Sequence, residues 1–393
     1  MSSAISQFIE KVATSERSED VSLCEIETAV NEVKRQGDEI SRGTTIHLIQ
    51  QLSCFALDQD AKKAQCVIKF VNTLWDATDG DPLYVDLIPL LKPHLLLNLG
   101  DGSSAKRRNR VAPGLNPVLG VSSQEDEIRS RWKSQGGWKH VGLFYIVLLH
   151  LQHRDVSVEL RWITPGILNL LDDPHDIPLR VQGVQLVHAF VEVFRDPEHW
   201  VPFSSTGLFL LFEPVLKNMC YLVPTLYSTM DTTRVWRSVF PALIALYRVE
   251  FSDTLEYFRH LQSMCSEIVL RGLIPRLGVK YPTLTVQLLT TLSELLSKMG
   301  PLSVVLLQRT VYTLGECIVS DPFFTVADDI VTALLGCVET LVDVCPSERV
   351  AAHRYDLNAL FRIIRHKCES EGATTEAIGK IVLGLEARIP LDT

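Results

Sequence analysis

The sequence predicts an all-α protein, built as an α-solenoid of HEAT-like or armadillo-like antiparallel helix pairs. Three observations lead to this fold class. Apolar residues recur with helical spacing, proline-containing turns separate the apolar runs, and the helices come in pairs of roughly 40 residues, the period of HEAT and armadillo repeats. Strict two-residue alternation over the length of a strand is hard to find.

Helical spacing is clear in the segment from Cys66 to Trp75. Its apolar residues are Cys66, Val67, Phe70, Val71, Leu74 and Trp75. Residues spaced at i, i+1, i+4 and i+5 lie on one face of a helix, which can then be buried against a neighbour. The ranges 235–247 and 330–342 repeat this pattern, so the same arrangement is expected along most of the chain.

Aspartate–proline pairs punctuate the apolar runs at 81–82, 173–174, 196–197 and 321–322. Proline cannot continue a helix, and it pushes the preceding residue out of the α region. Pro178 and Pro282 each stand where a new helix is expected to begin, because the missing N–H has no partner to lose there. These signals predict helices over 141–153, 157–171, 178–195, 206–223, 232–250, 254–274, 282–299, 302–319, 326–344 and 348–368.

Composition divides the chain into three parts. Residues 1–99 are predicted to form an N-terminal region of four helices, and residues 128–393 a HEAT-like helical repeat array. Between them, residues 100–127 are rich in Gly, Ser, Pro and charge without any period, which is typical of a flexible linker. The basic run 106–110 fits a solvated part of that linker, but it also fits a nuclear address or a contact with an acidic partner.

The bulk numbers indicate an intracellular protein that binds neither membrane nor nucleic acid. The nine cysteines are widely spaced without a Cys-x-x-Cys pair, which is typical of reduced thiols in the cytoplasm and nucleus. The net charge is −9 and no long basic stripe occurs, which argues against nucleic acid. No uncharged apolar run reaches the roughly 18 residues that span a bilayer, and the N-terminus does not resemble a signal peptide.

No motif for enzyme chemistry or cofactor binding is found. The sequence has neither a Gly-x4-Gly-Lys phosphate loop nor a Gly-x-Ser-x-Gly nucleophile elbow. His150 and His153 lie on one predicted helix face, as two metal ligands would, but no third ligand follows from the spacing. We therefore expect no catalytic residues, no cofactor and no metal.

The stretch LNLLDDPHDIPLRVQGVQLVHAF, residues 168–190, is predicted to be the joint of a helical repeat. Asp172 and Asp173 end one helix, and they can cap the next helix or meet a neighbouring arginine such as Arg180. Gly183 would let a neighbouring helix approach closely. The alternative for Asp172 and Asp173 is a catalytic carboxylate pair.

Two tryptophans and two cations precede this joint. Arg131, Trp132, Lys133 and Trp138 are candidates for a contact with a partner, because tryptophan and arginine are enriched at interface hot spots. The other interpretation is that the tryptophans cover the core of the first repeat of the array.

The order of these motifs resembles the Tel-two-interacting protein two family. Arg131-Trp132-Lys133 is followed by a helix with Trp138, then LLDDP, then LRVQGVQL at 179–186, then STGL at 205–208. The resemblance covers roughly residues 129 to 370, and this chain lacks the proline that the family often carries within the Arg-Trp-Lys run.

The resemblance implies a non-enzymatic scaffold. The family supplies the smallest subunit of the TTT co-chaperone complex, whose larger subunits are HEAT-type proteins, and the largest of these is the expected direct partner. With the Hsp-ninety chaperone, that complex assists the maturation and stability of phosphatidylinositol-kinase-related protein kinases. The alternative is a generic HEAT-repeat adaptor in transport or chromatin-associated assemblies.

Overall fold

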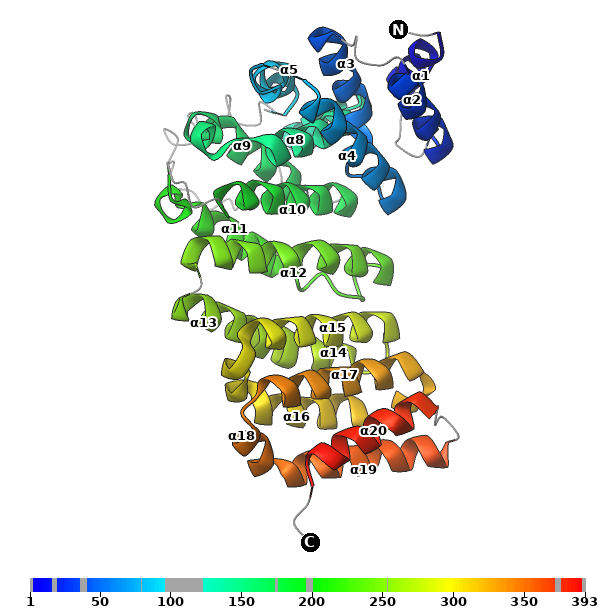
Figure 1. Cartoon of the computed structure of the whole chain (residues 1–393), viewed down its shortest axis with the longest axis vertical. Coiled ribbons are helices and arrows are strands. Elements are labelled where there is room, and N and C mark those ends of the chain that lie inside the picture. The colour runs from blue at the N-terminus through cyan, green and yellow to red at the C-terminus, as the bar shows by residue number, and fades with distance from the viewer. Residues whose placement is uncertain are drawn as a thin grey trace. The chain divides into compact units, whose positions relative to one another are not determined.

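The computed structural model shows a chain of packed helices (Figure 1). The structure describes residues 3–15, 20–35, 41–78, 80–95, 123–173, 176–195, 201–252, 254–371 and 376–390. No strand occurs in these ranges, where the only β-type pairing is an isolated bridge between Pro224 and Tyr227. The all-α prediction is therefore confirmed.

The helices form two compact units, Met1–Pro202 and Phe203–Thr393. This division differs from the predicted one at residues 100–127, because helices from both sides of that segment pack together in the first unit. The last five residues of the predicted linker, 123–127, belong to a helix, and residues 100–122 lie outside the described part of the chain.

Among its described residues, the first unit contains five α-helices before residue 96, where four were predicted, and four more after residue 122. They are α1 (Ser3–Thr14), α2 (Leu23–Arg35), α3 (Arg42–Leu52), α4 (Ala61–Asp76), α5 (Tyr84–Leu95), α7 (Ser123–Ser134), α8 (Trp138–His150), α9 (Val156–Leu171) and α10 (Ile177–Glu192). Short 3₁₀ turns adjoin α3, α9 and α10. They are η2 (Ser53–Phe55), η3 (His153–Asp155) and η4 (Val193–Arg195), respectively.

The core of the first unit is built around α8. This helix contacts α5, α10 and η2, and it is apolar on nearly every side because it has neighbours on nearly every side. Its buried residues are Val141, Gly142, Leu143, Phe144, Ile146, Val147 and Leu148. Gly142 lies so close to η2 that a Cβ atom there would be 1.9 Å from the carbonyl oxygen of Ser53.

The second unit begins with a 3₁₀ turn, η5 (Phe203–Thr206), and continues to residue 390. Its further elements are α11 (Leu208–Met219), α12 (Thr229–Phe251), α13 (Leu255–Ser263), η6 (Met264–Leu273), α14 (Ile274–Leu277), α15 (Pro282–Met299), η7 (Gly300–Leu306), α16 (Leu307–Leu314), η8 (Gly315–Val319), η9 (Phe324–Val326), α17 (Asp328–Val344), α18 (Ser347–Ala352), α19 (Arg354–Ser370) and α20 (Glu376–Arg388). The segments η6 and η8 are π-helical and continue the helices before them.

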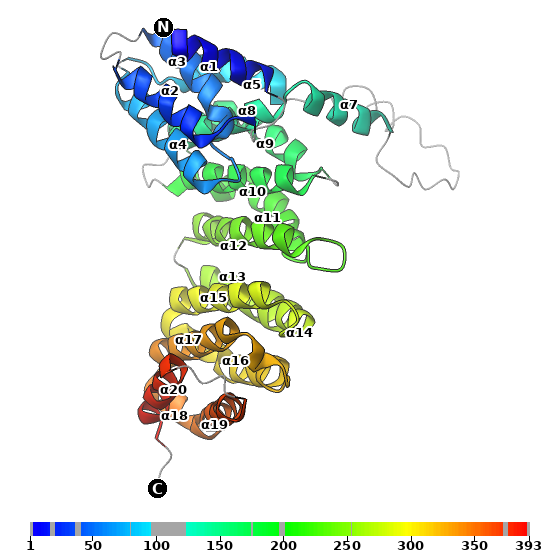
Figure 2. The same cartoon turned by 90° about the vertical axis from the view of Figure 1, so that its right-hand side faces the viewer.

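Within the second unit, the helices lie in two layers (Figure 2). In one layer α12 contacts α15, α15 contacts α17, and α17 contacts α20. In the other layer η6 contacts α16, and α16 contacts α19. Leucines of α15 are buried because that helix has neighbours in both layers.

One helical stretch of the second unit, Pro282–Val319, is long and apolar enough to cross a membrane by length and composition alone. Half of its apolar window is buried inside the protein, where α15 packs against α12, α13 and α17. That half is used in a protein core, and the expected lack of a membrane partner stays a prediction.

Replacing Gly142 with alanine should destabilise the first unit, because the added methyl group would overlap Ser53 and force α8 away from η2. We expect a loss of about 1–3 kcal/mol in the free energy of unfolding, measured by urea denaturation. Gly43→Ala is the matched control, since Gly43 lies in α3 with no atom within 4 Å of an added Cβ, and it should be neutral or slightly stabilising. Equal stability of the two variants would contradict the close approach.

Candidate functional site

Lys133 joins α7 to the turn between α9 and α10. Its Nζ atom lies 2.7 Å from Oδ2 of Asp173 and 2.9 Å from Oδ2 of Asp176. Asp173 is only 3% exposed, whereas the side chain of Lys133 is 36% exposed. The sequence indicated Lys133 as a candidate partner contact and Asp173 as part of a repeat joint, and the structure brings the two together.

Each of the two aspartates also accepts a hydrogen bond from a backbone N–H group. Oδ1 of Asp173 accepts a hydrogen bond from the N–H of Asp176 at 3.0 Å, and Oδ1 of Asp176 accepts one from the N–H of Leu179 at 2.9 Å. Asp176 is therefore the N-cap of α10, where Pro178 stands in the first turn as predicted. Both carboxylates use one oxygen for the turn and the other for Lys133.

The carboxylates also change the proton affinity of Lys133. Partial burial lowers the pKa of the amine, but the hydrogen bonds to Asp173 and Asp176 outweigh burial, so the pKa is raised above its ordinary value. Lys133 stays charged across the physiological range, and the ion pairs persist there. We call Lys133, Asp173 and Asp176 the α7 clamp.

A second set of contacts links α7 to α9 and α5. Nη1 of Arg129 donates a hydrogen bond to the carbonyl oxygen of Asn169 at 2.7 Å, and the side-chain amide of Asn169 donates one to the carbonyl oxygen of Leu95 at 3.2 Å. Arg129 and Arg180 both act electrostatically on Asp172, which is exposed at the end of α9. The pairing of Asp172 with Arg180 stays a prediction, while Asp173 contacts Lys133.

Gly183 lies where α9 crosses α10. A Cβ atom at this position would be 3.0 Å from Cδ2 of Leu171 and 3.3 Å from Cβ of Leu170. An added side chain would press on these two leucines, so the lack of one at Gly183 suits the close packing of the two helices.

Trp132 contacts the C-terminal end of α5. The indole Nε1 of Trp132 donates a hydrogen bond to the carbonyl oxygen of His94 at 2.7 Å. The ring of Trp132 lies against Gly137, where a Cβ atom would be 2.2 Å from the indole. The imidazole of His94 stacks on that of His140 with the ring centroids 3.8 Å apart.

Trp138 is half-buried on the other side of the α7–α8 turn. Its ring lies 6.5 Å from the ring of Phe55, and Nζ of Lys139 lies 5.6 Å above it while donating to the carbonyl oxygen of Val12 at 2.8 Å. Both tryptophans are therefore held within the first unit, and among the four candidate contact residues Arg131 is the exposed one.

The predicted histidine pair has two separate environments. Nε2 of His150 lies 3.0 Å from Oδ1 of Asn72, and its ring stacks on Trp75 with centroids 3.9 Å apart. Nε2 of His153 lies 2.8 Å from the carbonyl oxygen of Val201. In the part of the chain that the structure describes, no group of three or more His, Cys, Asp or Glu is arranged to hold a metal ion.

Several residues of the site were missed by the sequence analysis. Asp176 could have been found as the polar residue just before Ile-Pro at the start of α10, which is an N-cap pattern. Arg129, Asn169 and His94 give no such signal, because they contact the site through packing of segments that are distant in the sequence.

The fold and the site define an all-helical protein of many packed helices, in which the polar groups of the site hold helices together. Comparison with known proteins gives the family. A sequence model described as the Tti2 family matches residues 48–326. A protein of Saccharomyces cerevisiae named TEL2-interacting protein 2 is 39% identical over 353 residues, which cover 87% of this chain and 83% of the relative.

The chain belongs to the Tti2 family. This result confirms the resemblance on which the sequence analysis relied. No solved structure matches the chain.

Replacing Lys133 with methionine should destabilise the first unit, because it removes the ion pair between Lys133 and the buried carboxylate of Asp173. A fully buried pair would cost roughly 3–5 kcal/mol on loss of one partner, and the partial exposure of Lys133 reduces the expected loss to about 1–3 kcal/mol. Arg131→Met removes a nearby exposed cation and should change stability by less than about 0.5 kcal/mol. Urea denaturation of both variants tests this, and an unaltered midpoint for Lys133→Met would show that the clamp is not stabilising.

Because His140 is partly buried and stacked on His94, we expect the stability of the first unit to depend on pH. Burial, together with the neighbouring His94 and Lys139, lowers the pKa of His140 from 6.5 to about 4. Between these values the unfolded chain takes up a proton that the folded chain does not, so stability is lost as the pH falls through this window. We expect a loss of about 1–3 kcal/mol from this site between pH 7 and pH 4.5. His140→Asn should show a smaller loss in the same urea titrations, whereas an equal loss would assign the effect to other groups.

Proposed function

We propose that the chain is a non-enzymatic scaffold subunit of the TTT co-chaperone complex. The observation that carries this proposal is its membership of the Tti2 family over most of its length. The relative in Saccharomyces cerevisiae is named for an interaction with TEL2, and we extend that interaction to this chain. The largest TTT subunit would be its chief direct partner.

The finer fold that we propose is a HEAT-like or armadillo-like α-solenoid. The two helix layers of the second unit support this assignment, because successive helices of each layer contact one another. Such stacked pairs give long surfaces on which a partner solenoid can lie. A stable interface of this kind buries on the order of 2,000 Å² or more.

The proposed role is mechanical and needs no reacting group. The polar side chains of the joint are used to fix α7, α9 and α10, as the α7 clamp illustrates. A rigid scaffold of this type would keep the larger subunits in a shape that can present kinase-class clients to the Hsp-ninety machinery. We place this activity in both the cytoplasm and the nucleus.

Co-purification from cells tests the proposal. A tagged full-length chain should bring down TEL2 and the largest TTT subunit in comparable amounts, identified by mass spectrometry. Depletion of the chain should lower the protein levels of phosphatidylinositol-kinase-related kinases while their messenger levels stay unchanged. The matched control is a cell line that carries the tag alone, with the endogenous chain present.

Two results would contradict the proposed function. If the tagged chain recovers transport or chromatin-associated proteins without TEL2, the chain is a generic helical-repeat adaptor and the co-chaperone role is wrong. If TEL2 is recovered but kinase levels do not fall on depletion, the partner assignment stands and the proposed client class is wrong.

A further inference from the structure

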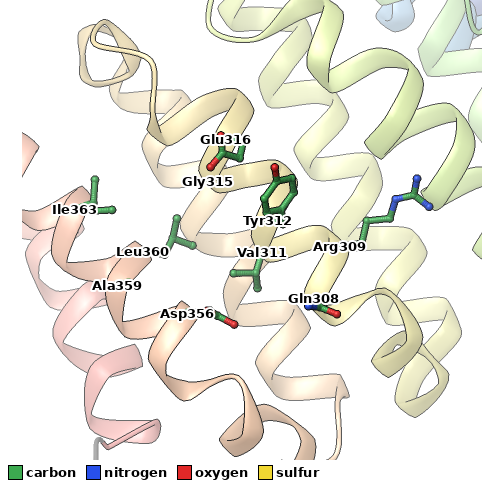
Figure 3. Close-up of a pocket in the computed structure, with 10 residues that line it drawn as sticks. All are labelled: Gln308, Arg309, Val311, Tyr312, Gly315, Glu316, Asp356, Ala359, Leu360 and Ile363. Atoms are coloured by element: carbon green, nitrogen blue, oxygen red, sulfur yellow. The ribbon is translucent and has the colours of Figure 1, made fainter.

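A groove of about 500 Å³ runs between two helices of one layer of the second unit (Figure 3). One wall comes from α16 and the start of η8, and the other comes from α19. We call it the α16–α19 groove. It lies far in sequence from the α7 clamp, and it belongs to the second unit alone.

The residues that line the groove follow helical spacing on both walls. On one wall they are Gln308, Val311, Tyr312, Gly315 and Glu316, and on the other they are Asp356, Ala359, Leu360 and Ile363. Both sets follow the i, i+3, i+4, i+7 pattern that a helix normally turns towards another helix. In this groove, no helix of the described chain covers the two stripes.

Apolar side chains stand exposed at the rim. Tyr312 is 67% exposed and Ile363 is 47% exposed, whereas Val311 and Leu360 are buried and form the floor. Gly315 adds no side chain to the groove, and a Cβ atom there would lie in ordinary contact with Cδ1 of Leu360, at 3.9 Å. An aromatic and a branched aliphatic side chain left in water beside a groove are typical of an interaction site.

The charges of the groove are not balanced within the described residues. Arg309 also lines the groove, where it lies 3.5 Å from Oε1 of Glu267, a carboxylate that it shares with Arg271, and donates a hydrogen bond to Ser266. Glu316 is exposed and has no ion-pair partner in the described part of the chain. Within the described ranges Asp356 is paired only with His353, at 3.4 Å, and its side chain is 65% exposed. With two carboxylates and one guanidinium group, the described lining of the groove carries a net negative charge.

We propose that the α16–α19 groove docks an amphipathic helix of a partner protein, with apolar residues in the groove and basic residues facing Glu316 and Asp356. The negative charges of Glu316 and Asp356 favour a partner with basic residues at facing positions. The apolar floor between two helices selects a third helix, whose i, i+3, i+4, i+7 positions can fill it.

An extended peptide fits the groove less well than a helix does. Added strands bind through the open backbone edge of a sheet, and the described chain offers no strand. A helix satisfies its own backbone hydrogen bonds and needs only side-chain contacts. The proposal rests on the groove alone and stands whichever assembly the chain joins.

The test uses the full-length chain and two synthetic peptides of about 15 residues, long enough to be helical when bound. Both carry leucines at i, i+3, i+4 and i+7. One bears two lysines beside this stripe, and the other bears two glutamates at the same positions. Fluorescence anisotropy should give at least about tenfold tighter binding of the lysine peptide at moderate salt.

Substitutions at exposed residues of the rim test whether the peptide binds in the groove, and they leave the buried core unchanged. Ile363→Asp should abolish binding of the lysine peptide, while Val158→Asp, the same change at an exposed residue of the first unit, should leave it unaltered. The double variant Glu316→Lys with Asp356→Lys should invert the preference, so that the glutamate peptide binds more tightly.

Three outcomes would overturn the proposal. The first is equal binding of the two peptides, or binding that survives Ile363→Asp. The second is undiminished binding of a lysine peptide with a central proline, which would show that an extended segment occupies the groove. The third is self-association of the chain in sedimentation that Ile363→Asp abolishes, because the occupant would then be a second copy.

Discussion

The first unit depends on contacts that join helices before residue 96 to helices after residue 122. The helix α8 is the centre of these contacts, since it packs on both α5 and η2, and Gly142 allows the closest of them. The indole of Trp132 and the amide of Asn169 add polar contacts to carbonyl oxygens at the end of α5. Burial of apolar surface stabilises this arrangement, and the hydrogen bonds give it one specific geometry.

The α7 clamp fixes the position of α7, because each of its two carboxylates contacts both Lys133 and a backbone N–H group of the turn. A carboxylate that is buried without a cation or a donor is costly, so the turn and α7 stabilise each other. Arg131 is left exposed on the same helix. Structural polar groups and an exposed cation therefore share α7.

Helix type and most helix positions could be predicted from the sequence, because apolar spacing and prolines are local signals. α15, for example, begins at Pro282 and ends at Met299, as predicted. The division into units could not be predicted, because a linker-like composition does not reveal that the helices on either side of it pack together. Likewise, the sequence indicated Asp173 as a joint residue, but its partner is Lys133, which stands 40 positions earlier in the chain. The spacing between them carries no periodic signal.

The most direct test of this account is a cut in the full-length chain between residues 100 and 122, made with a specific protease at an engineered site. The two pieces should stay together in size-exclusion chromatography under native conditions and separate only in denaturant, because α5, α7 and α8 hold them. Separation of the pieces in native buffer would contradict the claim that the first unit is one packed body.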